Sequence, residues 1–201
     1  LPGGVNIAPT EQVALVRGPA GERELASARW WLTPSWAQEV DQKYSMFNAR
    51  CETLGSSPAF RGPFRYRRGI VPMSSFIEWR QEGAAKQPWL ISNESGALAV
   101  AALWDVWQGG ADTLLSCTLV TTAAAPLFAP WHRRMPVILA ADECERWLDC
   151  SHAIAAGDPL FRSELKQTLR LRALSKAVGN ARNKDPALLA GVGEVIELRA
   201  P

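Results

Sequence analysis

The chain of 201 residues lacks the short motifs that mark several large enzyme classes. It contains no GxGxxG, Walker loop, GxSxG elbow or HExxH, so nucleotide-binding, hydrolase-elbow and zinc-peptidase functions lose their usual sequence support. Its four cysteines show no CxxC spacing, which predicts reduced thiols in a cytoplasmic compartment and no metal site. No apolar run is long enough to cross a bilayer and nothing resembles a targeting peptide, so we expect no membrane partner.

An excess of one charge is also missing. The formal net charge of +2 is too small to indicate nucleic acid by itself. Four arginines nevertheless cluster, at Arg61, Arg65, Arg67 and Arg68, although a solvated face is the plainer interpretation of such a cluster. Hydrophobic residues make up 47% of the chain, enough to bury the core of one domain. The first residue is not methionine, and we expect Leu1 to follow further residues of the native protein.

The stretch FNARCET at residues 47–53 carries the most informative pattern. In a strand, side-chain alternation places Asn48, Arg50 and Glu52 on one face and the apolar residues, Cys51 among them, on the other. A buried amide, guanidinium and carboxylate would each need a partner, which favours the floor of a polar pocket. The alternative is the solvated outer face of an antiparallel sheet.

Strand patterns dominate the rest of the chain. Residues 13–17 and 23–31 flank the turn sequence GPAG, which is typical of a hairpin. Further strands are predicted over residues 76–79, 87–93, 97–107, 114–122, 169–174 and 194–199, and helices over residues 142–149 and 159–166.

Two residues have the character of proton-transfer groups. Glu78 lies between bulky apolar neighbours, where desolvation raises the pKa of a carboxyl and suits it to general acid or base catalysis. The alternative is a rim carboxylate paired with an arginine. His132 precedes two arginines and a buried strand, and a neutral imidazole there can pass a proton near neutral pH. A structural histidine is the alternative. In the loop after residue 31, Trp36 either belongs to the core or stacks on a base.

Seven strings, taken together and in this order, resemble the SOS-response-associated peptidase family over essentially the whole chain. They are Asn6-Ile-Ala-Pro9, Asn48-Ala-Arg-Cys-Glu-Thr53, Arg68-Gly-Ile-Val-Pro72, Phe76-Ile-Glu-Trp79, Thr121-Thr122, His132-Arg-Arg-Met-Pro-Val-Ile-Leu139 and Ser175-Lys-Ala-Val-Gly-Asn180. The resemblance implies an α+β fold, with a barrel-like, mainly antiparallel β-sheet core and peripheral helices, in a single domain over residues 1–201.

The resemblance also implies a function. The family binds single-stranded DNA, or single-strand/double-strand junctions, that contain abasic sites. Its nucleophile is the cysteine that removal of the initiator methionine exposes, a self-processing step. The α-amine and thiol of that cysteine capture the ring-opened sugar as a Schiff base and then a thiazolidine. We therefore expect a monomeric cytoplasmic DNA-processing enzyme, associated with the nucleoid when bound to DNA, that needs no cofactor and no metal.

The matched motifs imply three catalytic residues. Asn48 is expected to hold the N-terminal cysteine or the sugar. Glu78 is expected to transfer protons during ring opening and methionine removal. His132 is expected to assist formation and reversal of the Schiff base.

Five further residues are implied in DNA binding. Arg50 and Arg134 are expected to contact phosphates, and Thr122 matches a position beside the sugar. Pro9 and Trp36 match residues that contact or wedge bases near the junction.

The chain departs from the family pattern at its start. The family begins Met-Cys-Gly-Arg and carries a helix before the Asn-Ile-Ala-Pro string, whereas this sequence has no cysteine before Cys51. Cys51 is expected to face away from Asn48, and a side-chain thiol without an adjacent free amine cannot close a thiazolidine. The family segment is therefore either truncated or disordered, or this is a natural member that has lost the chemistry. The second possibility predicts a non-covalent binder of single-stranded DNA or junctions.

Overall fold

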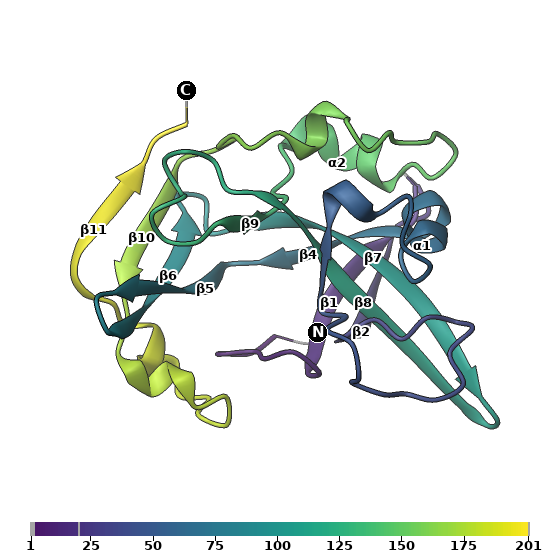
Figure 1. Ribbon diagram of the computed structural model, residues 1–201, viewed down its shortest axis with the longest axis horizontal. Coiled ribbons are helices and arrows are strands. Elements are labelled where there is room, and N and C mark those ends of the chain that lie inside the picture. Colours follow the sequence, from purple (N-terminus) through teal and green to yellow (C-terminus); the bar gives the residue numbers. More distant parts are fainter. Residues whose placement is uncertain (1–2, 20, 201) are drawn as a thin grey trace.

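The computed structural model describes residues 3–19 and 21–200, arranged as two β-sheets with short helices at the periphery (Figure 1). Leu1, which we expect to follow further native residues, lies outside the described residues. The strands are β1 (Gln12–Arg17), β2 (Glu24–Trp30), β3 (Asn48–Arg50), β4 (Arg68–Met73), β5 (Ser75–Glu82), β6 (Ala85–Asn93), β7 (Leu98–Gly109), β8 (Asp112–Ala123), β9 (Arg134–Pro136), β10 (Leu169–Ala173) and β11 (Val192–Leu198). The helices are α1 (Arg61–Tyr66) and α2 (Ala141–Leu148).

The larger sheet closes on itself. Its strand order is β2-β1-β4-β7-β8-β3, and β2 also pairs with β8, so β2, β1, β4, β7 and β8 form a ring. The closing pair is parallel, with Arg29 opposite Ser116, whereas the other neighbours in the ring are antiparallel. The expected α+β fold with a barrel-like, mainly antiparallel core is confirmed.

The second sheet has the order β11-β10-β6-β5 and is antiparallel throughout. It follows directly from the first, because only Ser74 separates β4 from β5. One apolar core lies between the sheets and takes in Val71 and Val100 from the barrel and Ile91 and Leu169 from the second sheet. Burial of this shared core fixes the two sheets against each other.

Local sequence patterns account for most of these elements. The predicted hairpin is confirmed as β1 and β2, and Gly18 and Gly21 adopt the positive φ angles, 91° and 85°, that its turn requires. The predicted helix at 142–149 is confirmed as α2. Among the residues that the structure describes, no helix combines the length and apolarity needed to cross a membrane.

Three expectations are corrected. The second predicted helix, over residues 159–166, is only a 3-10 turn (Pro159–Phe161), because Arg162 has an extended backbone with ψ of 142°. The strand predicted at 47–53 ends at Arg50 and continues as a 3-10 helix (Cys51–Thr53). The arginine cluster is not wholly solvated, since Arg68 is 1% exposed.

Candidate functional site

Strand β8 brings two of the sequence motifs together. β3 pairs with one edge of β8, placing Asn48 opposite Leu119 and Arg50 opposite Thr121. β9 pairs with the other edge, placing Arg134 opposite Ala123. The β8 partners of these residues, at positions 119, 121 and 123, alternate along the strand and therefore point to the same face. Residues that are directly opposed in a sheet also share a face, so the side chains of Asn48, Arg50 and Arg134 lie on one face.

The opposite face of the same strands is core. Ala49 is fully buried between Asn48 and Arg50, and Cys51 is 3% exposed. Burial raises the pKa of the Cys51 thiol, which keeps it protonated and a poor nucleophile. The predicted alternation is thus confirmed, and Cys51 faces away from Asn48.

Glu52 and Thr121 hold the guanidinium of Arg134. Arg134 Nη1 donates to Glu52 Oε1 at 2.6 Å and Nη2 donates to Glu52 Oε2 at 3.0 Å. Nη2 also donates to the Thr121 carbonyl at 2.7 Å and to its hydroxyl at 3.1 Å. The Arg134 hydrogen bonds lower the pKa of the Glu52 carboxyl, and the same contact raises the pKa of Arg134.

Glu78 and His132 form a second pair. Nδ1 of His132 lies 3.9 Å from Oε1 of Glu78, and the two side chains are 48% and 23% exposed. Burial raises the pKa of the Glu78 carboxyl, while the nearby His132 opposes that rise. Glu78 is opposite Trp89 in the sheet, and Trp89 packs edge-on against Trp131, with ring centroids 5.8 Å apart.

The backbone of Arg134 connects the two groups. Nδ1 of His132 is 2.9 Å from the Arg134 carbonyl oxygen and 3.2 Å from the Arg134 amide nitrogen. It donates to the carbonyl when it carries the ring proton and accepts from the amide when it does not. The carboxyl and imidazole pair therefore lies next to the Glu52 and Arg134 ion pair. Among the described residues, no hydrogen bond joins Asn48 to Glu78 or His132, and none engages the Arg50 guanidinium.

A cavity of about 470 Å³ is lined by residues of β1, β4, β5 and the N-terminal loop. Its wall includes Leu119, which is opposite Asn48, and Ile77, but not Asn48, Glu78, His132 or Arg134. Because successive residues of a strand point to opposite faces, Glu78 leaves β5 on the face opposite Ile77. Pro9 lines it too, so the structure places this residue near the candidate site but not in contact with the charged groups. Gly3 and Gly4, the first residues described, are also in its wall. Most of the remaining wall is apolar.

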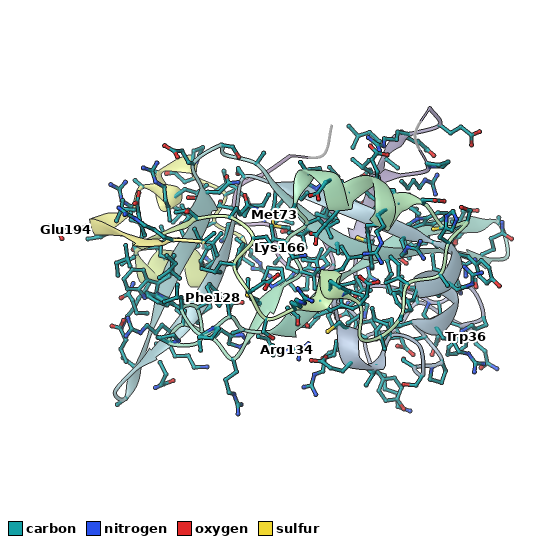
Figure 2. All side chains as sticks on the ribbon, turned by 90° about the horizontal axis from the view of Figure 1, so that it is seen from above. Trp36, Met73, Phe128, Arg134, Lys166 and Glu194 are labelled. Atoms are coloured by element: carbon teal, nitrogen blue, oxygen red, sulfur yellow. The ribbon has the colours of Figure 1, made fainter. Side chains whose placement is uncertain are left out.

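Two of the expected site residues lie apart from this group. Thr122 faces the core at 5% exposure, where its hydroxyl donates to the Phe161 carbonyl at 2.6 Å. Trp36 is 65% exposed in the loop between β2 and β3. In Figure 2 it lies at the end of the molecule opposite Glu194 and well separated from Arg134.

Sequence reasoning did not assign a role to two residues that the structure places at the site. Thr121, not Thr122, has its hydroxyl on Arg134. Glu52 was recognised only as part of the polar face of residues 47–53, and nothing in the sequence pairs it with Arg134, 82 positions away. Within residues 3–19 and 21–200, no three His, Cys, Asp or Glu side chains gather as a metal site would require.

A sequence model of the family described as SOS response associated peptidase (SRAP) matches residues 2–181. The chain belongs to this family. It is 32% identical over 192 residues to the abasic site processing protein YoqW of Bacillus subtilis, covering 92% of this chain and 84% of YoqW. It is 30% identical over 198 residues to the abasic site processing protein HMCES of Xenopus tropicalis, covering 86% of this chain but only 59% of HMCES.

The fold of this SRAP chain also occurs in a solved structure. A crystal structure of a protein from Bacteroides thetaiotaomicron superposes with a TM-score of 0.81, covering 91% of this chain and 82% of the other at 24% identity. At that identity the likeness concerns the fold alone.

Family strings that are distant in the sequence meet in space. The Asn6 side-chain amide donates to the carbonyls of Val178, Asn180 and Asn183 at 3.0, 3.1 and 3.2 Å. Asn6 adopts a positive φ of 54°, which asparagine tolerates better than most residues. The first and last of the seven strings therefore form one structural unit beside the cavity.

Proposed function

We propose that the complete protein recognises abasic sites in single-stranded DNA, or at its junctions with duplex, and captures them covalently. The observation that carries the proposal is the Glu78 and His132 pair, 3.9 Å apart, in which burial raises the pKa of the carboxyl. Such a pair suits proton transfer, because the buried carboxyl holds its proton more tightly than an exposed one and the imidazole lies beside it. The names of YoqW and HMCES, abasic site processing proteins, support DNA of this kind as the substrate.

The proposed chemistry requires a cysteine with a free α-amine. The amine adds to the aldehyde of the ring-opened sugar, and loss of water gives a Schiff base. The thiol then adds to the imine carbon and its proton passes to the nitrogen, which closes a five-membered thiazolidine. In this scheme protonated Glu78 delivers a proton to the departing oxygen, and His132 assists in forming and reversing the Schiff base. Asn48 holds the cysteine or the sugar.

The cavity is compatible with an amino terminus that arrives from the Gly3 side. Gly3 and Gly4 line the same cavity as Ile77 and Leu119, the neighbours of Glu78 and Asn48. An extended chain spans about 3.3 Å per residue, so a segment of only a few residues would be long enough to cross much of a cavity of this size.

In this proposal DNA is bound mainly through its backbone. Arg50 and Arg134 contact phosphates, which gives affinity without sequence preference and suits a lesion that arises anywhere. Pro9, in the cavity wall, and Trp36, exposed on its loop, supply apolar surface for bases. Thr122 stays a weaker assignment, because its hydroxyl is already bonded to Phe161.

The test is a denaturing gel with an oligonucleotide that carries one abasic site. Full-length protein with an N-terminal cysteine is expected to give a slower, covalent band, and residues 1–201 alone are not. Glu78→Gln should reduce the yield, whereas Glu82→Gln, a matched change at the exposed end of the same strand, should not. A full-length wild type that forms no adduct would contradict the proposal.

Self-removal of the initiator methionine is part of the same proposal. Mass measurement of the purified full-length protein is expected to show methionine removed from the wild type and retained in Glu78→Gln. Equal processing of both proteins would show that a host aminopeptidase does this step and that Glu78 has no part in it.

The second candidate is a non-covalent binder of single-stranded DNA or junctions. It is favoured by the exposed indole of Trp36 and by Arg50, whose guanidinium no described residue engages. Binding that weakens steeply with salt, with no covalent product even from full-length protein, would select this function over covalent capture.

A further inference from the structure

We infer that Glu52 is a positioning residue, which acts through Arg134 to fix both a phosphate-facing guanidinium and the backbone that holds His132. The inference rests on the proposed function, because it assumes that Arg134 meets DNA and that His132 takes part in the chemistry. It is drawn from three sets of contacts among residues 52, 121, 132 and 134.

The first set of contacts is the two-pronged ion pair. Both terminal nitrogens of Arg134 donate to the two oxygens of Glu52, at 2.6 and 3.0 Å. A planar fork of this kind fixes the orientation of the guanidinium as well as its position. The pair also joins separate elements, since Glu52 follows β3 on one edge of β8 and Arg134 begins β9 on the other.

The second set uses the one hydrogen that remains on Nη2, which two oxygens of Thr121 share. This nitrogen reaches the carbonyl and hydroxyl of Thr121 on β8, at 2.7 and 3.1 Å. The Nε atom of Arg134 is buried and has no partner among the described residues. One hydrogen on Nη1 is therefore left for a phosphate, and Glu52 and Thr121 together decide where it points.

The third set connects this cluster to the imidazole. His132 Nδ1 lies against both the amide nitrogen and the carbonyl oxygen of Arg134, at 3.2 and 2.9 Å. The backbone contact is made at Nδ1, the same nitrogen that lies 3.9 Å from Glu78. It sets the ring's orientation and leaves Nε2 available to the substrate. Loss of the Glu52 anchor frees the start of β9 and so loosens the support of His132.

A purely repulsive role for Glu52 makes the opposite prediction. A carboxylate that does nothing except repel DNA phosphates weakens binding, so its removal tightens binding whatever stands at position 134. A positioning role predicts that removal weakens binding, and only when Arg134 is present. The sign of the effect and its dependence on Arg134 therefore separate the two roles.

The experiment is a double-mutant cycle on full-length protein with Glu52→Gln and Arg134→Ala, read by fluorescence anisotropy with an intact single-stranded oligonucleotide. We expect Glu52→Gln to weaken binding by about tenfold, roughly one charge-assisted contact, and to have no further effect in the Arg134→Ala background. Glu197→Gln is the matched control, because Glu197 pairs with Arg170 on the second sheet at 3.2 Å. It should leave binding unchanged.

A second measurement reports on His132 without DNA or turnover. The ¹⁵N shifts of its ring show which nitrogen carries the proton, and a His152→Gln variant assigns the signals. We expect Glu52→Gln to change the ¹⁵N shifts of His132 and Glu197→Gln to leave them unchanged. A melting curve for each variant shows that the protein measured is folded. Tighter binding by Glu52→Gln, or an equal effect with and without Arg134, would overturn the inference. Failure of wild type to form an adduct would instead refute the proposed function and leave the cycle interpretable.

Discussion

Arg68 and Arg50 differ in what their guanidinium groups contact. Arg68, at the start of β4, is buried, and its nitrogens donate to the carbonyls of Phe64, Trp147, Asp149 and His152. Arg50, at the end of β3, is exposed, and no described residue engages its guanidinium.

The difference lies in how many donors are already used. Arg68 is committed to the chain's own carbonyls, several of which follow the end of α2, where a cation is favoured. Arg134 is intermediate, with most of its donors on Glu52 and Thr121. Of these three arginines, Arg50 alone presents a full set of donors to an incoming anion. A count of arginines in a sequence therefore overstates the surface available to DNA.

The largest effect is expected at the buried site. Arg68→Met should lower the free energy of unfolding by about 3 kcal/mol or more, because several carbonyls lose a charged donor and are left buried. In a chain of this length that corresponds to a fall in Tm of about 6–12 °C, measured by calorimetry. DNA affinity of the folded fraction should not change. A loss of DNA affinity at unchanged Tm would place Arg68 in the binding site and would contradict the contrast between Arg68 and Arg50.

Arg50→Ala should weaken DNA binding and leave the Tm almost unchanged, the opposite of what we expect for Arg68→Met. We expect binding of an intact single strand to weaken by about tenfold and the slope of log affinity against log salt to fall by about 0.7, the value for one phosphate contact in single-stranded DNA. The Tm should change little, since the side chain is exposed and no described residue engages it. Arg17→Ala, which removes a paired arginine on β1, serves as the control. An unchanged slope would argue against a phosphate contact.

Glu78→Gln should raise the stability of the protein while it lowers the yield of the covalent adduct. Burial raises the pKa of this carboxyl in the folded chain above its ordinary 4.5, so the folded state holds the proton more tightly than the unfolded state. Folding is then penalised once pH rises through the folded pKa, and the penalty is absent below 4.5. We expect Glu78→Gln to melt at a higher temperature than wild type at pH 7, with the gap closing as pH falls. A gap that widens toward acid pH would contradict the raised pKa.

The smallest effects are expected at the two threonines. Thr122→Val removes a buried hydrogen bond to Phe161 and should cost about 1 kcal/mol without altering DNA binding. Thr121→Val removes the hydroxyl contact with Arg134 and should weaken binding by about twofold with little change in Tm. If Thr122→Val were the variant that weakens binding, the assignment of Thr122 beside the sugar would regain support.

Local patterns were enough to predict much of the fold. Alternation predicted the β1 and β2 hairpin and the polar face of residues 47–53, and turn residues marked the ends of the longer strands. The barrel itself came from the resemblance to the family. Its closure depends on the parallel pairing of Arg29 with Ser116, and no local pattern specifies a register between segments so far apart.

The sequence predicted which types of residue form the site, but not which of these residues contact one another. The apolar neighbours of Glu78 correctly indicated a raised pKa. Which of Thr121 and Thr122 faces Arg134 is set by the register of β8 against β9, where a shift of one residue exchanges the faces. The burial of Arg68 could not be predicted either, because three of its four acceptors lie in the last turn of α2 and just after it, 79 to 84 positions away.

The three bonds of Asn6 have a consequence for synthesis of the chain. Their acceptors lie 172 to 177 positions later, and Lys184 adds contacts to the Asn6 carbonyl and to Glu11. On the ribosome these contacts of the first loop therefore cannot form until residues 178–184 have emerged, since domains fold as their sequence becomes available. A nascent chain stopped at residue 181 would lack Asn183, Lys184 and β11, so Asn6 would lose one of its three acceptors and both Lys184 contacts, and β10 would pair with β6 alone.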